Sequence, residues 1–324
     1  MGEATDAVTA ADVRRAAERI RAVVYRTPVF HSHTLDRLVG AESQLKMESL
    51  QRGGSFKIRG AYNKLATLSA QELAHGVVAS SSGNHAQAVA IAATFVGTHA
   101  TIVMPIDAIP EKVEATRGYG ATVVPCDRAV EDLEERAVRL AEDLGCTLVH
   151  PFDDPLVIAG QGTGTLELLE EIDELDVLLV PIGGGGLIAG SAVIAADVSP
   201  RTRVIGVEPA GADDTKRSLA SGERIRHPAP RSIADGQLVP CPGAQTFPLI
   251  SRFVEDILLV EDADITRAMR ILFERLKVVV EPSGASAVAA ALRYGPNLSA
   301  ARIGILVSGG NVSAQRFGEL MQIS

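Results

Sequence analysis

Five short segments of the sequence carry residues that could do chemistry. Four of them directly follow an apolar run: 80–85, which ends in Gly83-Asn84-His85, the glycine run 183–186, the pair Glu208-Pro209, and 308–311, which begins with Ser308. The fifth places Lys57 among glycines, just before an expected helix. Ligands bind to open parallel sheets where strands end and helices begin. These segments are therefore the candidate ligand-binding positions of the chain.

The run Gly183, Gly184, Gly185 and Gly186 predicts a phosphate-binding loop. It lies between an expected strand and an expected helix, so bare backbone N–H groups can point at an anion at a helix N-terminus. Taken alone, the run leaves other ligands open. Gly184-x-Gly186-x-x-Ala189 also fits a loose dinucleotide fingerprint with Glu208 as the ribose-binding acid, which would indicate a nicotinamide or flavin oxidoreductase. Glycines that serve only close packing are a third possibility.

The sequence around Lys57 narrows the choice among these three interpretations of the glycine run. A single lysine is usually a solvated surface charge, but this one stands in Ser55-Phe56-Lys57-x-Arg59-Gly60-Ala61. The segment resembles the pyridoxal-5′-phosphate (PLP) binding motif of the threonine/serine dehydratase and serine racemase family, in the tryptophan synthase β-like (fold type II) group. Ser82-Gly83-Asn84-His85, the glycine run and Ser308-Gly309-Gly310-Asn311 are similar to that family's other motifs, in the same order. The resemblance extends from Arg26 to Asn311.

The resemblance implies a role for each residue around the cofactor. Lys57 would carry PLP and remove the Cα proton of the substrate, because burial lowers its pKa and leaves a neutral amine at working pH. Phe56 would pack beside the cofactor ring, and Asn84 would hydrogen-bond the 3′-oxygen. Ser308 would face the pyridine nitrogen, and the glycine run would hold the phosphate.

The turn at the start of the next helix is implied to bind the substrate carboxylate through Ser81, Ser82, Gly83, Asn84 and His85. Ser82 matches the residue that works on the cofactor face opposite the lysine in the racemase branch, but it also occurs in dehydratases. A serine-rich turn is, in addition, an ordinary helix N-cap. Dehydration needs one base, whereas racemisation needs proton transfer on two faces, so a racemase activity stays open.

The segment from Glu208 to Asp214 resembles the divalent-cation site of the racemase-like branch. The implied ligands are the side chains of Glu208 and Asp214 and the carbonyl of Ala212. Oxygen ligands of this kind suit Mg²⁺, with Ca²⁺ or Mn²⁺ as alternatives. An acidic helix start that the helix dipole favours is the other interpretation.

The predicted reaction is β-elimination, the dehydration and deamination of L-threonine or L-serine to a 2-oxo acid and ammonia. Serine racemase and 3-hydroxyaspartate dehydratase activities are alternatives on the same fold. A second substrate carboxylate needs an extra cation, yet Leu133 stands where the racemase branch has an arginine, while Arg128 and Arg136 are close in sequence. A non-catalytic PLP-binding protein and the oxidoreductase remain as hypotheses from other classes.

The elements that must position these residues alternate between strands and helices. Expected strands at 77–80, 99–104, 121–125 and 147–150 form one series, with a helix over 128–144; strands at 177–182, 203–207, 257–260 and 303–307 form a second. Such alternation predicts an α/β fold with two lobes, each a mainly parallel sheet flanked by helices. We expect a large PLP-binding domain of residues 1–68 and 150–324, and a small substrate-clamping domain of residues 69–149.

Composition excludes several partners. The chain is 46% hydrophobic and 22% charged, with a net charge of −9 and no basic block, so neither nucleic acid nor a membrane is an expected partner. The seven histidines show no HxxxH or similar metal spacing. Three scattered cysteines without a CxxC pair, and an N-terminus unlike a signal peptide, predict a cytoplasmic location. Enzymes of the resembled group usually form dimers, which predicts a homodimer.

Overall fold

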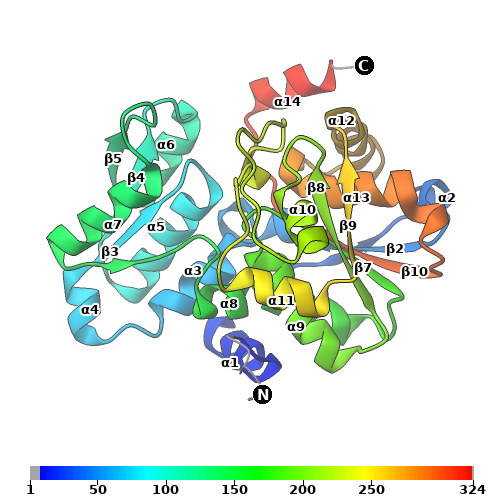
Figure 1. Cartoon of the computed structure of the whole chain (residues 1–324), viewed down its shortest axis with the longest axis horizontal. Helices are drawn as coiled ribbons and strands as arrows, with labels where there is room; N and C mark the ends of the chain where they lie inside the picture. Colours follow the sequence, from blue (N-terminus) through cyan, green and yellow to red (C-terminus); the bar gives the residue numbers. More distant parts are fainter. Residues whose placement is uncertain (1–7, 323–324) are drawn as a thin grey trace.

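The computed structural model describes residues 8–322, which form two lobes that lie side by side (Figure 1). The larger lobe is built on a six-stranded sheet of order β1-β2-β10-β7-β8-β9. Its strands are β1 (Val29–His31), β2 (Glu42–Met47), β7 (Val177–Pro181), β8 (Arg203–Pro209), β9 (Asp256–Val260) and β10 (Arg302–Val307). All neighbours are parallel except the β1–β2 pair.

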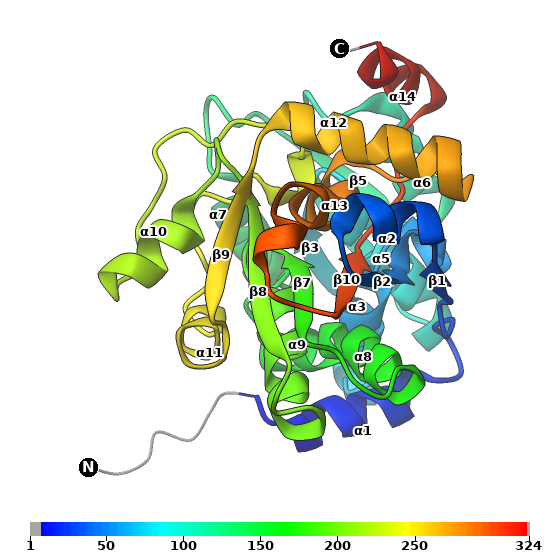
Figure 2. The same cartoon turned by 90° about the vertical axis from the view of Figure 1, so that its right-hand side faces the viewer.

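Helices cover both faces of this sheet (Figure 2). One face carries α2 (His33–Val39), α12 (Asp262–Ile271) and α13 (Pro282–Tyr294), and the other carries α1 (Ala10–Ile20), α8 (Pro155–Glu171), α9 (Gly186–Val198) and α11 (Thr246–Phe253). In β7, Val177 and Leu179 pack into the first core, while Leu178 and Val180 pack into the second. Successive strand residues point to opposite faces. This burial on both faces explains why the strand is apolar throughout.

The smaller lobe contains a fully parallel four-stranded sheet of order β5-β4-β3-β6. It consists of β3 (Val77–Ser80), β4 (Ala100–Pro105), β5 (Thr122–Cys126) and β6 (Thr147–Leu148), with α4 (Ala70–His75), α5 (Asn84–Val96), α6 (Pro110–Gly118) and α7 (Leu133–Leu144). The prediction of a helix from residue 128 was wrong at its start. Asp132 accepts hydrogen bonds from the N–H groups of Glu134 and Glu135, and this cap begins the helix at Leu133.

Shorter helical and turn elements complete the described chain around the larger sheet. They are α10 (Asp214–Ser221), α14 (Ala314–Met321), the π-helical turn η4 (Leu272–Leu276) and the short 3₁₀ turns η1 (Glu48–Leu50), η2 (Arg52–Gly54), η3 (Asp235–Gln237) and η5 (Gly295–Asn297). Within residues 8–322, no helix has the length and apolar character needed to span a membrane. The uncharged stretch that begins at Val177 forms the strand β7 and the helix α9, and not one membrane-spanning helix.

Helix α3 (Lys57–Leu65) connects the lobes, because it packs against α8 of the larger lobe and α5 of the smaller one. The approach to α8 requires glycine on both helices. A Cβ on Gly60 would lie 2.8 Å from the carbonyl oxygen of Val157, and a Cβ on Gly160 would lie 2.5 Å from that of Arg59. Tight packing therefore fixes the first turn of α3, where Lys57 stands.

The strands of the smaller sheet all come from 77–148, and those of the larger sheet come from 29–47 and 177–307. This separation supports the division into a large domain of 1–68 and 150–324 and a small domain of 69–149, which we retain as a proposal. Residues 1–7 and 323–324 lie outside the described residues.

Candidate active site

A cavity of about 480 Å³ lies between the two lobes. Several segments of the chain meet around it, and most come from the ends of parallel strands or the first turns of helices. The predicted catalytic, cofactor and substrate residues that line it are Phe56, Lys57, Ser81, Ser82, Gly83, Asn84, His85, Gly183, Gly184, Gly185, Gly186 and Ser308. The fold thus brings this whole predicted set together, while Glu208, Ala212 and Asp214 are not part of the lining.

Lys57 extends into the cavity from the first turn of α3. Its Nζ donates a hydrogen bond to the carbonyl oxygen of Pro151 at 2.8 Å and lies 5.1 Å from the centroid of the Phe56 ring. Among the described residues, no carboxylate forms an ion pair with it. Burial lowers the pKa of Lys57 from 10.5 to about 8, because the charged ammonium loses water and gains no counter-charge.

The glycine run forms the turn between β7 and the first residue of α9. Gly185 has a φ of +94°, and a Cβ on Gly184 would lie 2.4 Å from the ring of Phe152. A Cβ on Gly186 would lie 2.5 Å from Oε1 of Gln161. Only glycine fits this loop, which exposes backbone N–H groups at the N-terminus of a 13-residue helix. The loop therefore fits the phosphate of PLP.

Asn84 lies in the first turn of α5 and is held by two side chains from the opposite lobe. Its Nδ2 donates to Oε1 of Glu281 at 2.6 Å, and its Oδ1 accepts from Nδ2 of Asn311 at 2.9 Å. Burial, followed by the charge of Asp235, raises the pKa of Glu281 to about 7. The sequence interpretation missed Glu281. The available signal was an acid directly before Pro282 at the start of an apolar helix.

The loop that precedes α5 is ordered by its own polar groups. The N–H of Gly83 donates to the Oγ of Ser81 at 3.1 Å, while Ser82 is exposed to the cavity. His85 shares a hydrogen bond between its Nε2 and the carbonyl oxygen of Val149, and burial together with the charge of Lys57 lowers its pKa to about 3. His85 is therefore a neutral anchor for this loop rather than a cation.

Ser308 directly follows β10, whose neighbour in the parallel sheet is β7, the strand that precedes the glycine run. Its side chain is buried at the cavity wall, and its backbone carbonyl accepts the N–H of Phe56 at 3.1 Å. This bond fixes the end of β10 relative to α3. The adjacent Gly309 has no room for a side chain, because a Cβ there would lie 2.1 Å from Oε1 of Glu281.

Glu208 and Asp214 form a separate buried acidic pair beyond the cavity wall. Glu208 lies near the end of β8 and accepts the N–H groups of Thr215 and Lys216 at 3.0 and 2.9 Å. Burial raises the pKa of Glu208 to about 8 and that of Asp214 to about 7. Within residues 8–322, Oδ2 of Asp214 has no hydrogen-bond partner. A buried carboxylate oxygen without a partner, beside a second carboxylate and the buried turn residue Ala212, fits a hard divalent cation.

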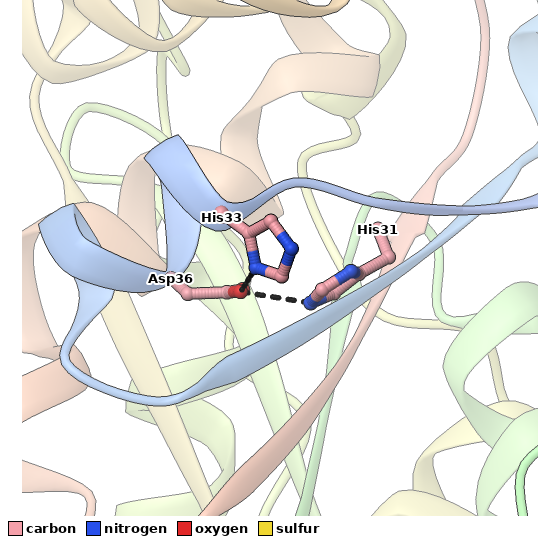
Figure 3. Close-up of side chains that lie close together, drawn as sticks. All are labelled: His31, His33 and Asp36. Carbon is pink, nitrogen blue, oxygen red and sulfur yellow. Dashed lines mark ion pairs between the residues drawn. The ribbon is translucent and has the colours of Figure 1, made fainter.

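A second group of metal-type side chains lies on β1 and α2, outside the cavity (Figure 3). Nε2 of His31 lies 2.8 Å from Oδ2 of Asp36, and Nδ1 of His33 lies 3.6 Å from the same oxygen. The spacing His-x-His-x-x-Asp was not recognised in the sequence. Both histidines are exposed, and the contact between His31 and Asp36 is sufficient to account for their arrangement.

Comparison with known proteins identifies the family. Residues 20–309 match the family model described as "Pyridoxal-phosphate dependent enzyme". The chain is 46% identical to an L-threo-3-hydroxyaspartate ammonia-lyase from Pseudomonas sp, over 96% of this chain and 98% of that protein. Its structure matches maize serine racemase with a TM-score of 0.93 at 42% identity, covering 97% of both chains. It matches a threonine deaminase from T.th. with a TM-score of 0.89 at 46% identity, covering 94% of this chain and 99% of that one.

The chain belongs to the family of pyridoxal-phosphate dependent enzymes. Its architecture is the tryptophan synthase β-like fold type II, and its relatives are ammonia-lyases and racemases. The resemblance drawn from the sequence is thereby confirmed, together with PLP as the cofactor. The family also sets aside the dinucleotide interpretation of the glycine run.

Proposed function

We propose that this enzyme eliminates water from 3-hydroxy amino acids, with L-threonine and L-serine as its simplest substrates, and releases a 2-oxo acid and ammonia. The observation that carries this proposal is the position of Lys57. It is a half-buried lysine with no acidic partner among the described residues, in the same cavity as a phosphate-type glycine loop. The names of its relatives, which include ammonia-lyases for threonine and 3-hydroxyaspartate, support the same reaction class.

In this proposal, three groups of cavity-lining residues have separate roles. PLP supplies an electron-withdrawing ring next to the substrate Cα. Lys57 would hold the cofactor, and once the substrate's amino group has replaced it there, its free neutral amine would accept the Cα proton. The hydroxyls and N–H groups of 81–85 bind the substrate carboxylate, and Gly183–Gly186 bind the phosphate. Asn84 holds the cofactor 3′-oxygen, with its orientation set by Glu281.

Ser308 and Phe56 complete the proposed cofactor environment. The hydroxyl of Ser308, which lines the cavity, would serve the pyridine nitrogen, and a neutral hydroxyl would not hold that nitrogen protonated as a carboxylate would. This weaker electron demand favours prompt loss of a β-substituent. Phe56 packs beside the ring and near the amine of Lys57.

We further propose that Glu208, Ala212 and Asp214 bind a divalent cation, most simply Mg²⁺, which stabilises the turn between β8 and α10. The ion would act through structure, because the electron-withdrawing group of the reaction is PLP. The enzyme is also proposed to work in the cytoplasm as a homodimer. Its three cysteines are free thiols, which supports a reducing compartment.

Serine racemisation is the second candidate reaction. It is favoured by Ser82, which lines the cavity on a different segment from Lys57 and is exposed to it. A racemase requires a proton donor on that second face. Loss of racemisation but not of dehydration in Ser82→Ala would support this assignment.

The direct test is a 2-oxo acid release assay with threonine, serine and 3-hydroxyaspartate in both stereochemical series, with and without EDTA. The wild-type holoenzyme is expected to release 2-oxo acid from at least one of them, and Lys57→Ala is expected to release none. Lys277→Gln, at an exposed lysine, is the matched control and is expected to keep full activity. Failure of the wild type with every substrate would refute the proposal.

A further inference from the structure

The cavity that contains Lys57 is lined by further basic side chains, and three of them already contact carboxylates of the protein. Lys112 binds Asp235 at 2.6 Å across the two lobes, and Nε2 of His150 lies 2.9 Å from Oε1 of Glu134. Arg128 donates two hydrogen bonds to Asp107 at 2.6 and 2.8 Å. These three side chains are therefore engaged by the protein itself.

The structure argues against Arg128 and Arg136 as binding partners of a second substrate carboxylate, a role that the sequence alone allowed. Arg128 is held by Asp107, and Arg136 faces Glu131 at 3.6 Å and is not among the cavity-lining residues. Leu133 does line the cavity, so this part of the wall offers an apolar surface. A cation for a distal carboxylate must come from another segment.

Two arginines from the segment after α10 fill that role. Arg224 and Arg226 both line the cavity at its exposed edge. Among the described residues, neither guanidinium forms an ion pair with a carboxylate. Arg224 uses its Nε to donate to the carbonyl oxygen of Pro242 at 2.8 Å, which fixes the segment while leaving the outer nitrogens of the guanidinium group available.

The two arginines face different parts of the cavity. Pro242 adjoins Gly243, whose N–H donates to the carbonyl oxygen of Gly184, so Arg224 stands beside the glycine run. The charge of Arg226 acts on a carboxyl group of the smaller lobe. The pKa of Glu134 in α7 is lowered by its hydrogen bond to His150 and, to a smaller extent, by the charge of Arg226. Arg226 therefore lies near α7, the helix that carries Leu133.

The arrangement of the proposed active site leaves one direction for the substrate's β-substituent. The α-carboxylate is assigned to 81–85, the phosphate to 183–186, and the amine side to Lys57. The remaining open wall is the mouth, where Arg226 stands. A guanidinium presents a planar fork of donors that matches a carboxylate, and it is always charged.

We propose that Arg226, supported by the charge of Arg224 on the same segment, forms a subsite for a second carboxylate, so that the preferred substrates are dicarboxylic 3-hydroxy amino acids. This inference rests on the proposed function and narrows its substrate class. On 3-hydroxyaspartate, the amine of Lys57 takes the Cα proton and the β-hydroxyl leaves with a proton as water. A second water then hydrolyses the resulting enamine to the 2-oxo dicarboxylate and ammonia.

Charge steering supports the same assignment. The chain carries a net charge of −9, which disfavours the approach of a substrate whose net charge is negative, as that of 3-hydroxyaspartate is. The guanidinium groups of Arg224 and Arg226 at the cavity mouth would offset that repulsion locally and attract the substrate. The value of kcat/KM for the dicarboxylate should therefore fall more steeply with added salt than the value of kcat/KM for serine.

The experiment compares kcat/KM for 3-hydroxyaspartate and for serine in the wild-type holoenzyme, Arg226→Gln, Arg226→Lys and the control Arg231→Gln. Arg231 is an exposed arginine of the same segment outside the cavity. Arg226→Gln should lower the ratio of the two kcat/KM values about 10- to 100-fold, mainly through KM for the dicarboxylate, as expected for a lost charged hydrogen bond. Arg226→Lys should restore part of it, and Arg231→Gln should leave it unchanged.

The outcomes separate the subsite from the underlying reaction. An unchanged ratio in Arg226→Gln, or equal losses for serine and 3-hydroxyaspartate, would overturn the subsite even if the enzyme is an active dehydratase. Wild-type turnover of serine with no advantage for the dicarboxylate would do the same. Absence of 2-oxo acid from every substrate would instead refute the proposed function, and the subsite with it.

Discussion

Lys57 and Arg59 stand two residues apart on α3, and both bring a positive charge into the interior, yet their surroundings are opposite. Nε of Arg59 donates to Oε2 of Glu48 at 2.7 Å, and its Nη1 donates to Oε1 of Glu167 at 2.7 Å. These acids outweigh burial and raise the pKa of Arg59. Lys57 has only the carbonyl of Pro151 and the ring of Phe56, and burial lowers its pKa to about 8.

The difference shows how one helix can hold a structural cation and a reactive one. Two residues correspond to a rotation of about 200° around the helix axis, so the side chains point in nearly opposite directions. Arg59 points towards α8 and η1, where it joins Glu48, Glu167 and Lys46 in a buried ion-pair cluster. Lys57 points into the cavity. A buried cation with acids holds the fold together, and one without acids is available for chemistry.

The largest expected effect comes from removing the amine of Lys57. Lys57→Ala should reduce 2-oxo acid release by more than about 10³-fold, because the cofactor anchor and the base are lost together. When both proteins are compared without cofactor, its unfolding transition in urea should stay close to that of the wild type, since no ion pair is broken. Activity within about tenfold of the wild type would contradict the distinction between the two cations.

Removing Arg59 should do the reverse and act on stability. Arg59→Ala leaves Glu48 and Glu167 buried without their main partner, so it is expected to destabilise the holoenzyme by about 3–5 kcal/mol. Arg59→Lys keeps the charge but loses the fork of donors, so it should recover only part of this loss. Urea unfolding measures both, and a loss below about 1 kcal/mol in Arg59→Ala would show that the cluster contributes little.

The pKa of Lys57 can be tested in the cofactor-free protein by competitive acylation and peptide mass spectrometry. Only the neutral amine reacts, so labelling of Lys57 should rise with pH around a midpoint of about 8, well below the ordinary value of 10.5. Below the midpoint the amine is protonated and unreactive. Labelling of the exposed Lys277 provides the internal reference. A midpoint above 10 for Lys57 would show that burial does not shift its pKa.

Glu208 and Asp214 are buried acids, the counterpart of the unpaired cation Lys57. The expected effect of changing this pair is smaller than the effects at Lys57 and Arg59. Mg²⁺ at a hundredfold excess over its dissociation constant should raise the melting temperature of the holoenzyme by about 5 °C. EDTA should reverse the increase, and Asp214→Asn should abolish it. The matched control is Asp197→Asn, at an exposed acid outside this pair. The same response to Mg²⁺ in Asp214→Asn and the wild type would place the ion elsewhere.

Much of the fold and site could be predicted because their signals are local. Lys57, the glycine run and Ser308 stand in short motifs, and the alternation of strands with helices is visible along the chain. Glu281 and Arg226 were missed because their roles depend on distant partners: Glu281 is 197 residues from Asn84 in the sequence. The capping of α7 by Asp132 was also missed, because the apolar pattern continues upstream of the true helix start.

The central claim is that Lys57, and no other lysine, holds the cofactor. The most direct measurement is reduction of the holoenzyme with borohydride, which fixes PLP to its lysine, followed by peptide mass mapping. The added mass is expected on the peptide that contains Lys57. It should be absent from Lys46, a fully buried lysine that is paired with Glu167. Attachment of the cofactor to Lys46, Lys64 or Lys112 would contradict the account.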